Sequence, residues 1–160
     1  MTVDQEILDG VGAAAASYTD ITTGTSSLSG YSIVGTPYND GDPGGANLGL
    51  QFVVYISDDH SKIIVSFVGT NEGKDALGDL GLAWNQYSDS ENQTAINAAI
   101  ASAVTSYSGA DVTFAGHSAG GILAQYAAYD YQKQLIINND STTVNLVTNN
   151  APGAADKSWR

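Results

Sequence analysis

The feature that most constrains the fold of this chain is the stretch 111–129, in which an apolar run meets a serine flanked by glycines. The run Val112 to Ala115 has the composition of a buried strand, and Gly116-His-Ser-Ala-Gly120 and a helix-like sequence follow it directly. A strand, a sharp turn and a helix in this order lift a serine hydroxyl above the C-terminal edge of a parallel sheet. The glycines are needed because side chains two residues before and after the strained serine would collide with the neighbouring backbone. The sequence therefore predicts a nucleophile elbow with Ser118 at its tip.

The charge balance limits the classes of partner. Among 160 residues, 17 are Asp or Glu and 5 are Lys or Arg, which gives a net charge of −12. Nucleic acids and anionic membrane surfaces are bound through clustered cations, which this chain lacks. We therefore expect neither partner, and the sequence does not indicate an oligomeric state.

Cysteine content, apolar runs and composition bear on the compartment. There is no cysteine, so disulfide and thiolate chemistry are excluded. The N-terminal residues lack the basic and apolar regions of a signal peptide, and no apolar run is long enough to span a membrane. A composition rich in small and polar residues but poor in lysine is typical of bacterial proteins exported without such a signal. We predict an extracellular protein, with the cytoplasm as the alternative.

Apolar periodicity predicts an alternation of helices and strands along a single domain, 1–160. The polar turn 58–61 is short, so the two strands that it joins form an antiparallel hairpin. Helix starts are marked by two capping boxes, Thr2 with Gln5 and Ser90 with Gln93. The fold class is therefore α/β, with a mostly parallel sheet and an antiparallel hairpin strand. The predicted helices are 3–18, 75–87, 90–107, the one after the elbow and the start of one at 154–160; the predicted strands are 31–35, 48–57, 62–68, 112–115 and 143–148.

No cofactor is indicated. The loop 38–46 contains acidic residues, but they lack the spacing of an EF-hand, so we favour an ordinary turn cluster over a calcium site. An elbow serine instead requires hydrogen-bond donors for the developing oxyanion, a general base and an acid that orients the base. The N–H of Ala119, at the start of a helix, is one such donor. The loop Val68-Gly69-Thr70 is expected at the same sheet edge and can provide the second.

At this point the chain resembles the class 3 (fungal-type) lipases, in three motifs that occur in the family's order. The family's F-R-G-T motif and the aspartate-leucine pair after it are matched by Ser66-Phe-Val-Gly-Thr70 and Asp79-Leu. Its G-H-S-L-G-G elbow is matched by Phe114-Ala-Gly-His-Ser-Ala-Gly-Gly121. Its G-x-P-R-V-G loop is matched by Asn150-Ala-Pro-Gly153. The resemblance covers about residues 50–153 and implies the α/β-hydrolase fold. It also implies a lipid or small ester as substrate, Ser118 as nucleophile, Thr70 as oxyanion-hole residue and Asp79 as a supporting structural acid. Val68 departs from the family's arginine, and Ala119 from its leucine.

The general base is not evident. The family's catalytic aspartate and histidine lie well beyond the elbow, and no histidine follows Ser118 in this sequence. We expect the side chain of His117 to point away from the serine hydroxyl. His60 belongs to the hairpin turn, about 23 Å away at the opposite sheet edge, whereas proton transfer requires about 3 Å or one bridging water. Asp156 lies too soon after the elbow to match the family's aspartate. The sequence thus predicts the N-terminal part of a hydrolase domain that lacks its C-terminal strands.

Three hypotheses about function follow. The first is a serine ester hydrolase of the lipase type that forms an acyl-enzyme on Ser118, with an Asp/His pair supplied from outside these residues. The second is a non-catalytic module of a larger secreted protein that retains a degenerate hydrolase fold. The third is a thioesterase or peptidase on the same fold, because the chemistry of an elbow does not distinguish acyl groups. A lid over the site would lie within 72–90.

Overall fold

A mixed sheet of six strands lies at the centre of the part of the chain described by the computed structural model, residues 3–40, 49–69, 76–151 and 153. The strand order is β1-β3-β4-β5-β6, and β2 pairs with β3 beside β1. The strands are β1 (Tyr31–Ile33), β2 (Tyr38–Asn39), β3 (Gln51–Ser57), β4 (Lys62–Phe67), β5 (Asp111–His117) and β6 (Val144–Asn149). The helices are α1 (Val3–Thr23), α2 (Ala76–Ser88), α3 (Ser90–Ser106) and α4 (Ala119–Asn138).

The strands β4, β5 and β6 form the parallel core of the sheet. Lys62 is opposite Asp111, and Val112 is opposite Val144, so all three strands end at the same edge. The pairs β1–β3, β2–β3 and β3–β4 are antiparallel. The predicted α/β fold with a parallel core and an antiparallel hairpin is confirmed, and β1 and β2 enlarge its antiparallel part.

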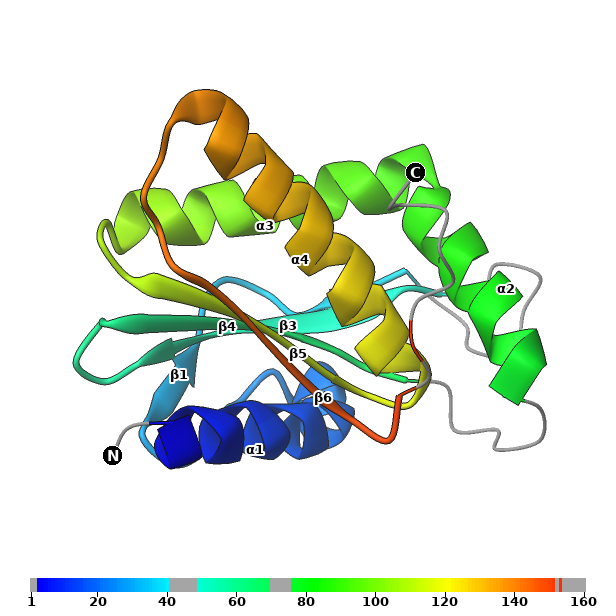
Figure 1. Cartoon of the computed structure of the whole chain (residues 1–160). Helices are drawn as coiled ribbons and strands as arrows, with labels where there is room; N and C mark the ends of the chain where they lie inside the picture. Colours follow the sequence, from blue (N-terminus) through cyan, green and yellow to red (C-terminus); the bar gives the residue numbers. More distant parts are fainter. Residues whose placement is uncertain (1–2, 41–48, 70–75, 152, 154–160) are drawn as a thin grey trace.

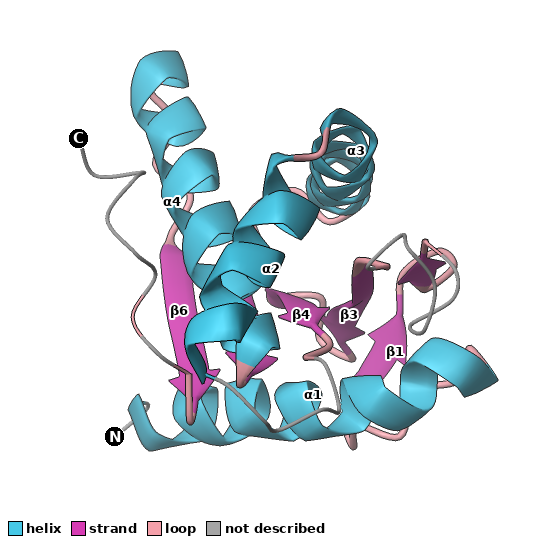
Figure 2. Ribbon diagram, turned by 90° about the vertical axis from the view of Figure 1, so that its right-hand side faces the viewer, coloured by secondary structure: helices cyan, strands magenta, loops and turns pink. Residues whose placement is uncertain are grey.

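Helices cover both faces of the sheet. Figure 1 shows α1 along one face and α2, α3 and α4 over the other, and the perpendicular view in Figure 2 shows the same three layers. Successive side chains of β3 point to opposite faces of the sheet, so they contribute in turn to the core under each helical layer. Phe52 and Val54 pack under α2–α4, whereas Val53 and Tyr55 pack against α1. Because both faces are buried, β4 is nearly continuously apolar, as its sequence predicted.

The first helix is longer than its apolar periodicity predicted, since the interval 19–23 is helical rather than part of a loop. The cause is a polar contact across the core. Asp20 is fully buried, and it accepts hydrogen bonds from the Tyr55 hydroxyl (2.8 Å) and the Ser27 N–H (3.0 Å). These bonds hold the last turn of α1 against the sheet, so tertiary contact overrides the weak helix propensity of Thr and Asp.

Two other local predictions need correction. The N-cap of α3 is Asp89 rather than Ser90, because the Asp89 carboxylate accepts from the N–H groups of Glu91 and Asn92. The short strand β2 was predicted as loop; it exists because Tyr38 pairs with Phe52 and stacks on its ring at 5.1 Å.

Some predictions concern residues outside the described part: the Thr2 cap, most of the acidic loop 38–46, and the helix at 154–160. Of the helices in the described part, none is long and apolar enough to cross a membrane.

Candidate active site

Ser118 lies at the turn between β5 and α4, at the edge where the parallel strands end. Its backbone has φ 54° and ψ −126°, a conformation that non-glycine residues rarely adopt and that costs about 1–3 kcal/mol. Its N–H donates to the Asn149 carbonyl at 3.1 Å, and its carbonyl accepts from the Gly121 N–H at 2.9 Å. The backbone of Ser118 is thus fixed by β6 and α4. The Ser118 side chain makes no hydrogen bond that caps the helix it precedes.

The flanking glycines are required by close backbone packing, as the sequence predicted. A Cβ at Gly116 would lie 2.2 Å from the Gly120 carbonyl oxygen. A Cβ at Gly120 would lie 2.3 Å from the Phe67 carbonyl oxygen and 2.9 Å from the Gly69 nitrogen. All three distances are too short for any side chain, so β5, α4 and the end of β4 can approach this closely only through glycine.

One of the two predicted oxyanion donors, Ala119, lies beside these contacts. Ala119 is buried at the first position of α4, where its N–H has no partner within the helix. Gly69, at the end of β4, lies against the Gly120 backbone beside it. Thr70, the predicted second donor, lies outside the described residues. Asp79 lies within α2, and its side chain also falls outside the described part.

Neither histidine reaches Ser118. The His117 side chain turns toward α1, where its Nδ1 lies 3.4 Å from the Tyr18 hydroxyl and the two rings meet edge to face. His60 lies in the hairpin turn with φ 59° and packs on Tyr107, with ring centroids 4.9 Å apart. It precedes β4, so the length of the strand separates it from the reactive edge. Both predictions about the histidines agree with this geometry. Asp156 lies outside the described residues.

Tyr18 is a residue of the site that the sequence analysis missed. Its hydroxyl accepts a hydrogen bond from the Gly69 N–H and also faces His117. Burial raises the pKa of Tyr18 above its usual value, and the Gly69 hydrogen bond partly opposes this shift. The hydroxyl thus supports the loop that follows β4. No local pattern indicates this role, because 99 residues separate Tyr18 from His117 in the sequence.

No metal site is found in the described part of the chain, where no three His, Asp or Glu side chains are grouped closely enough to hold an ion. The described residues place the Ser118 side chain beside the N-terminus of α4, where backbone N–H groups without helical partners can donate hydrogen bonds to a negatively charged oxygen.

Comparisons with known proteins agree with this geometry. The model of the family described as lipase (class 3) matches residues 64–160. No curated protein matches the chain.

Several solved structures share its fold. A lipase from Rhizopus microsporus var. chinensis superposes with a TM-score of 0.72 at 20% identity, over 95% of this chain and 59% of its own. The native Rhizomucor miehei lipase–propeptide complex superposes with a TM-score of 0.70 at 16% identity, over 97% of this chain and 55% of its own. Rhizomucor miehei triacylglyceride lipase superposes with a TM-score of 0.69 at 18% identity, over 90% of this chain and 60% of its own. The chain thus spans little more than half the length of these lipases.

Proposed function

The chain belongs to the class 3 lipase family, and from this premise we propose that it carries the nucleophile and the oxyanion donors of a serine ester hydrolase. The substrate class is a carboxylic ester of lipid type, such as a triacylglycerol. One of the similar structures is named a triacylglyceride lipase, which supports this choice. Extracellular action on such esters is part of the proposal and rests on composition.

In this proposal the Ser118 Oγ attacks the ester carbonyl carbon, and the carbonyl π electrons move to the oxygen. The Ala119 N–H and a donor from Thr70 hold that oxyanion. When the tetrahedral intermediate collapses, the alcohol leaves with a proton and an acyl group stays on Ser118. Water then attacks the acyl-enzyme, which releases the carboxylic acid and restores the hydroxyl.

The proton from Ser118 requires a base that this sequence does not provide near the hydroxyl. His117 is turned toward Tyr18, and His60 lies at the other end of β4. We therefore propose that the His/Asp pair belongs to a further segment of the domain. Without such a base, only the oxyanion hole and substrate binding still accelerate the reaction at an elbow serine. The hydrolysis rate then falls by several orders of magnitude.

The observation that carries the proposal is the conformation of Ser118. The protein maintains a strained φ of 54° at Ser118, between two glycines at which a Cβ would overlap neighbouring backbone atoms. Backbone strain of this kind is typical of a reactive serine. In a residue with only a packing role it would lower the stability of the fold without any benefit.

The test is hydrolysis of p-nitrophenyl esters and of triolein by the protein assembled with its further segment. We expect turnover that Ser118→Ala abolishes and that the matched change His60→Gln leaves intact. Turnover equal in the Ser118→Ala variant would refute the proposal, and no turnover in any form would favour a non-catalytic module. Faster cleavage of acyl thioesters than of oxygen esters would identify a thioesterase instead.

A further inference from the structure

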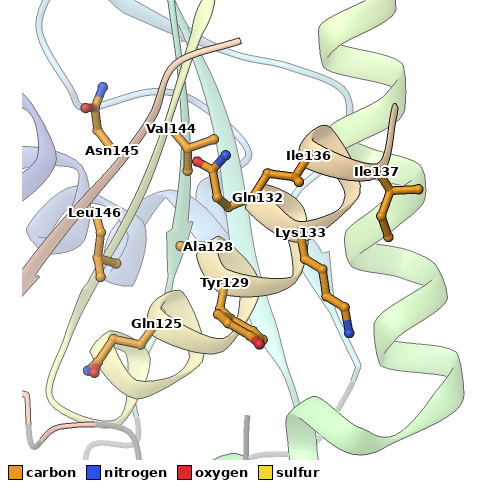
Figure 3. A pocket seen from close by; sticks show the side chains of 10 residues that line it. All are labelled: Gln125, Ala128, Tyr129, Gln132, Lys133, Ile136, Ile137, Val144, Asn145 and Leu146. Carbon is orange, nitrogen blue, oxygen red and sulfur yellow. The ribbon is translucent and has the colours of Figure 1, made fainter. Parts of the chain in front are cut away.

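An apolar groove lies between the second half of α4 and the start of β6, lined by the side chains that Figure 3 shows. Ile136, one of these residues, is 18 residues along α4 from Ser118, a distance of about 27 Å along the helix axis. A group that takes part in proton transfer must lie within about 3 Å of its partner, or one bridging water away. The groove therefore takes no direct part in chemistry at Ser118, and the groups that position the reaction lie closer to the elbow.

A polar contact lies behind the elbow, where α1 meets the ends of β4 and β5. The register of these two strands, continued past their ends, brings Gly69 to the level of Ser118. Gly69 packs so closely here that a Cβ would lie 2.6 Å from the His117 carbonyl oxygen and 2.8 Å from the Tyr18 hydroxyl oxygen. The position of Gly69 is thus set by the elbow backbone on one side and by Tyr18 on the other.

Hydrogen bonds join these groups into a chain. The Tyr18 hydroxyl accepts from the Gly69 N–H, and it lies 3.4 Å from Nδ1 of His117. A tyrosine hydroxyl has one proton to donate, and a neutral imidazole accepts only at the nitrogen that carries no proton. The Tyr18 proton can therefore go to His117 when the imidazole proton is on Nε2. With that proton on Nδ1, both neighbours would donate to the hydroxyl, and the Tyr18 proton would have no acceptor among the described residues.

This chain also limits which N–H groups can hold an oxyanion. Because the Gly69 N–H is bonded to the Tyr18 hydroxyl, it is not free for a substrate oxygen, and the loop must offer a later donor. The preceding residue, Val68, contributes only an aliphatic side chain, which packs against the core beneath α1. Within the described part of the chain, the polar side-chain contact to this loop thus comes from Tyr18, with His117 behind it.

We propose that His117 is a positioning residue of the oxyanion hole that acts through Tyr18. Its Nδ1 accepts the Tyr18 proton and so keeps the hydroxyl oxygen turned toward the Gly69 N–H. The orientation of the Gly69 peptide then fixes the direction in which the chain leaves β4 toward the second oxyanion donor. The effect on catalysis rests on the proposed function, whereas the hydrogen bonds themselves do not.

Two measurements on the protein as its source cell makes it test the hydrogen bonds without any need for activity. NMR of nitrogen-labelled imidazoles reports which ring nitrogen carries the proton, and the signal of His117 is identified by its loss in His117→Asn. At mildly alkaline pH, where an imidazole is ordinarily neutral, we expect the proton on Nε2. Hydrogen exchange of the Gly69 amide should be about threefold to tenfold faster in Tyr18→Phe, as expected for the loss of one neutral hydrogen bond.

Ester hydrolysis tests the positioning role. His117→Phe keeps a ring in place but removes the acceptor, so kcat/KM for a p-nitrophenyl ester should fall about threefold to tenfold. His117→Asn places an acceptor oxygen close to the position of Nδ1 and should recover most of that loss. In a Tyr18→Phe background, His117→Phe should cause no further loss, because both residues act through one hydroxyl. His60→Gln, at the other edge of the sheet, is the matched control.

The proposal is overturned by a proton on Nδ1 of His117, by Gly69 exchange that is unchanged in Tyr18→Phe, or by losses in kcat/KM that add independently in the double variant. Independent losses would give His117 and Tyr18 separate packing roles. An inactive protein with the expected imidazole signal and Gly69 exchange would contradict the proposed hydrolase and leave the hydrogen-bond chain in place. An active protein without them would do the opposite.

Discussion

Adding one methyl group at Gly116 tests the packing of the elbow most sharply. In Gly116→Ala the new Cβ would lie 2.2 Å from the Gly120 carbonyl oxygen and 2.6 Å from the Gly121 nitrogen. Ordinary contacts of a Cβ begin at 3.4 Å. Because the obstructing atoms are backbone, no change of rotamer relieves the overlap. The first turn of α4 must instead move away from β5 by about 1 Å in a closely packed interior.

The energetic cost follows from this displacement. Overpacking in a well-packed core costs about 1–3 kcal/mol. Here the movement also loosens Ala119 and Ile122, which are 2% and 0% exposed. We therefore expect the upper end of that range, a loss of about 3 kcal/mol in the free energy of unfolding. For a domain of this size, 1 kcal/mol corresponds to about 2–4 °C, so the Tm should fall by about 6–12 °C.

Urea and thermal unfolding followed by circular dichroism measure this effect. Gly81→Ala is the matched control, because Gly81 is exposed on α2 and a Cβ there meets no atom within 4 Å. Alanine is favoured over glycine in a helix by about 0.5–1 kcal/mol, so this variant should be stabilised. If Gly116→Ala loses less than about 0.5 kcal/mol, which is the range of a neutral surface change, then the argument from close backbone contact is refuted.

Three further predictions follow. Tyr18→Phe removes the acceptor of the Gly69 N–H, a bond of about 0.5–1.5 kcal/mol, and should slow covalent labelling of the nucleophile about threefold to tenfold. Asp59→Ala should lower stability at pH 7, and this loss should shrink steeply as the pH falls to 2 and below. Hydrogen bonds from neighbouring serines lower the Asp59 pKa from 3.8 to about 2, so the carboxylate stabilises the fold above pH 4, and this contribution is lost as the pH falls to 2. Asp89→Ala removes the N-cap of α3 and should cost about 1 kcal/mol in urea unfolding, whereas Ser90→Ala should cost little.

Each of these predictions has a result that contradicts it. Labelling unchanged in Tyr18→Phe would mean that the hydroxyl does not support the loop after β4. A stability difference for Asp59→Ala that persists at pH 2 would show that the carboxylate acts through something other than its charge. Equal losses of stability in Asp89→Ala and Ser90→Ala would contradict Asp89 as the N-cap and favour the capping box of Ser90 that the sequence predicted.

Much of the fold was predictable because local patterns and tertiary structure agree. The apolar run of β4 requires a strand that is buried on both faces. The glycine pair around Ser118 requires close backbone packing, and the short hairpin turn requires antiparallel neighbours. The elbow was also predictable, since its glycines are needed for steric reasons that any sequence must satisfy.

The parts that could not be predicted depend on contacts between distant residues. The extension of α1 depends on buried Asp20 and its bond to Tyr55, 35 residues later. The role of Tyr18 depends on Gly69, which only the closed fold brings to its hydroxyl. The choice of Asp89 over Ser90 as N-cap shows a different limit, because two adjacent residues both have capping side chains and the preceding turn decides between them.

The most direct test of the central claim is to locate the site of reaction with a fluorophosphonate, which phosphonylates activated serines. The protein, in the form in which its source cell makes it, is treated with the reagent, and the peptide that contains the elbow is identified by mass spectrometry. We predict one adduct on Ser118, lost in Ser118→Ala and retained in His60→Gln. An adduct on another serine, or none on Ser118, would contradict the claim that this chain carries the nucleophile.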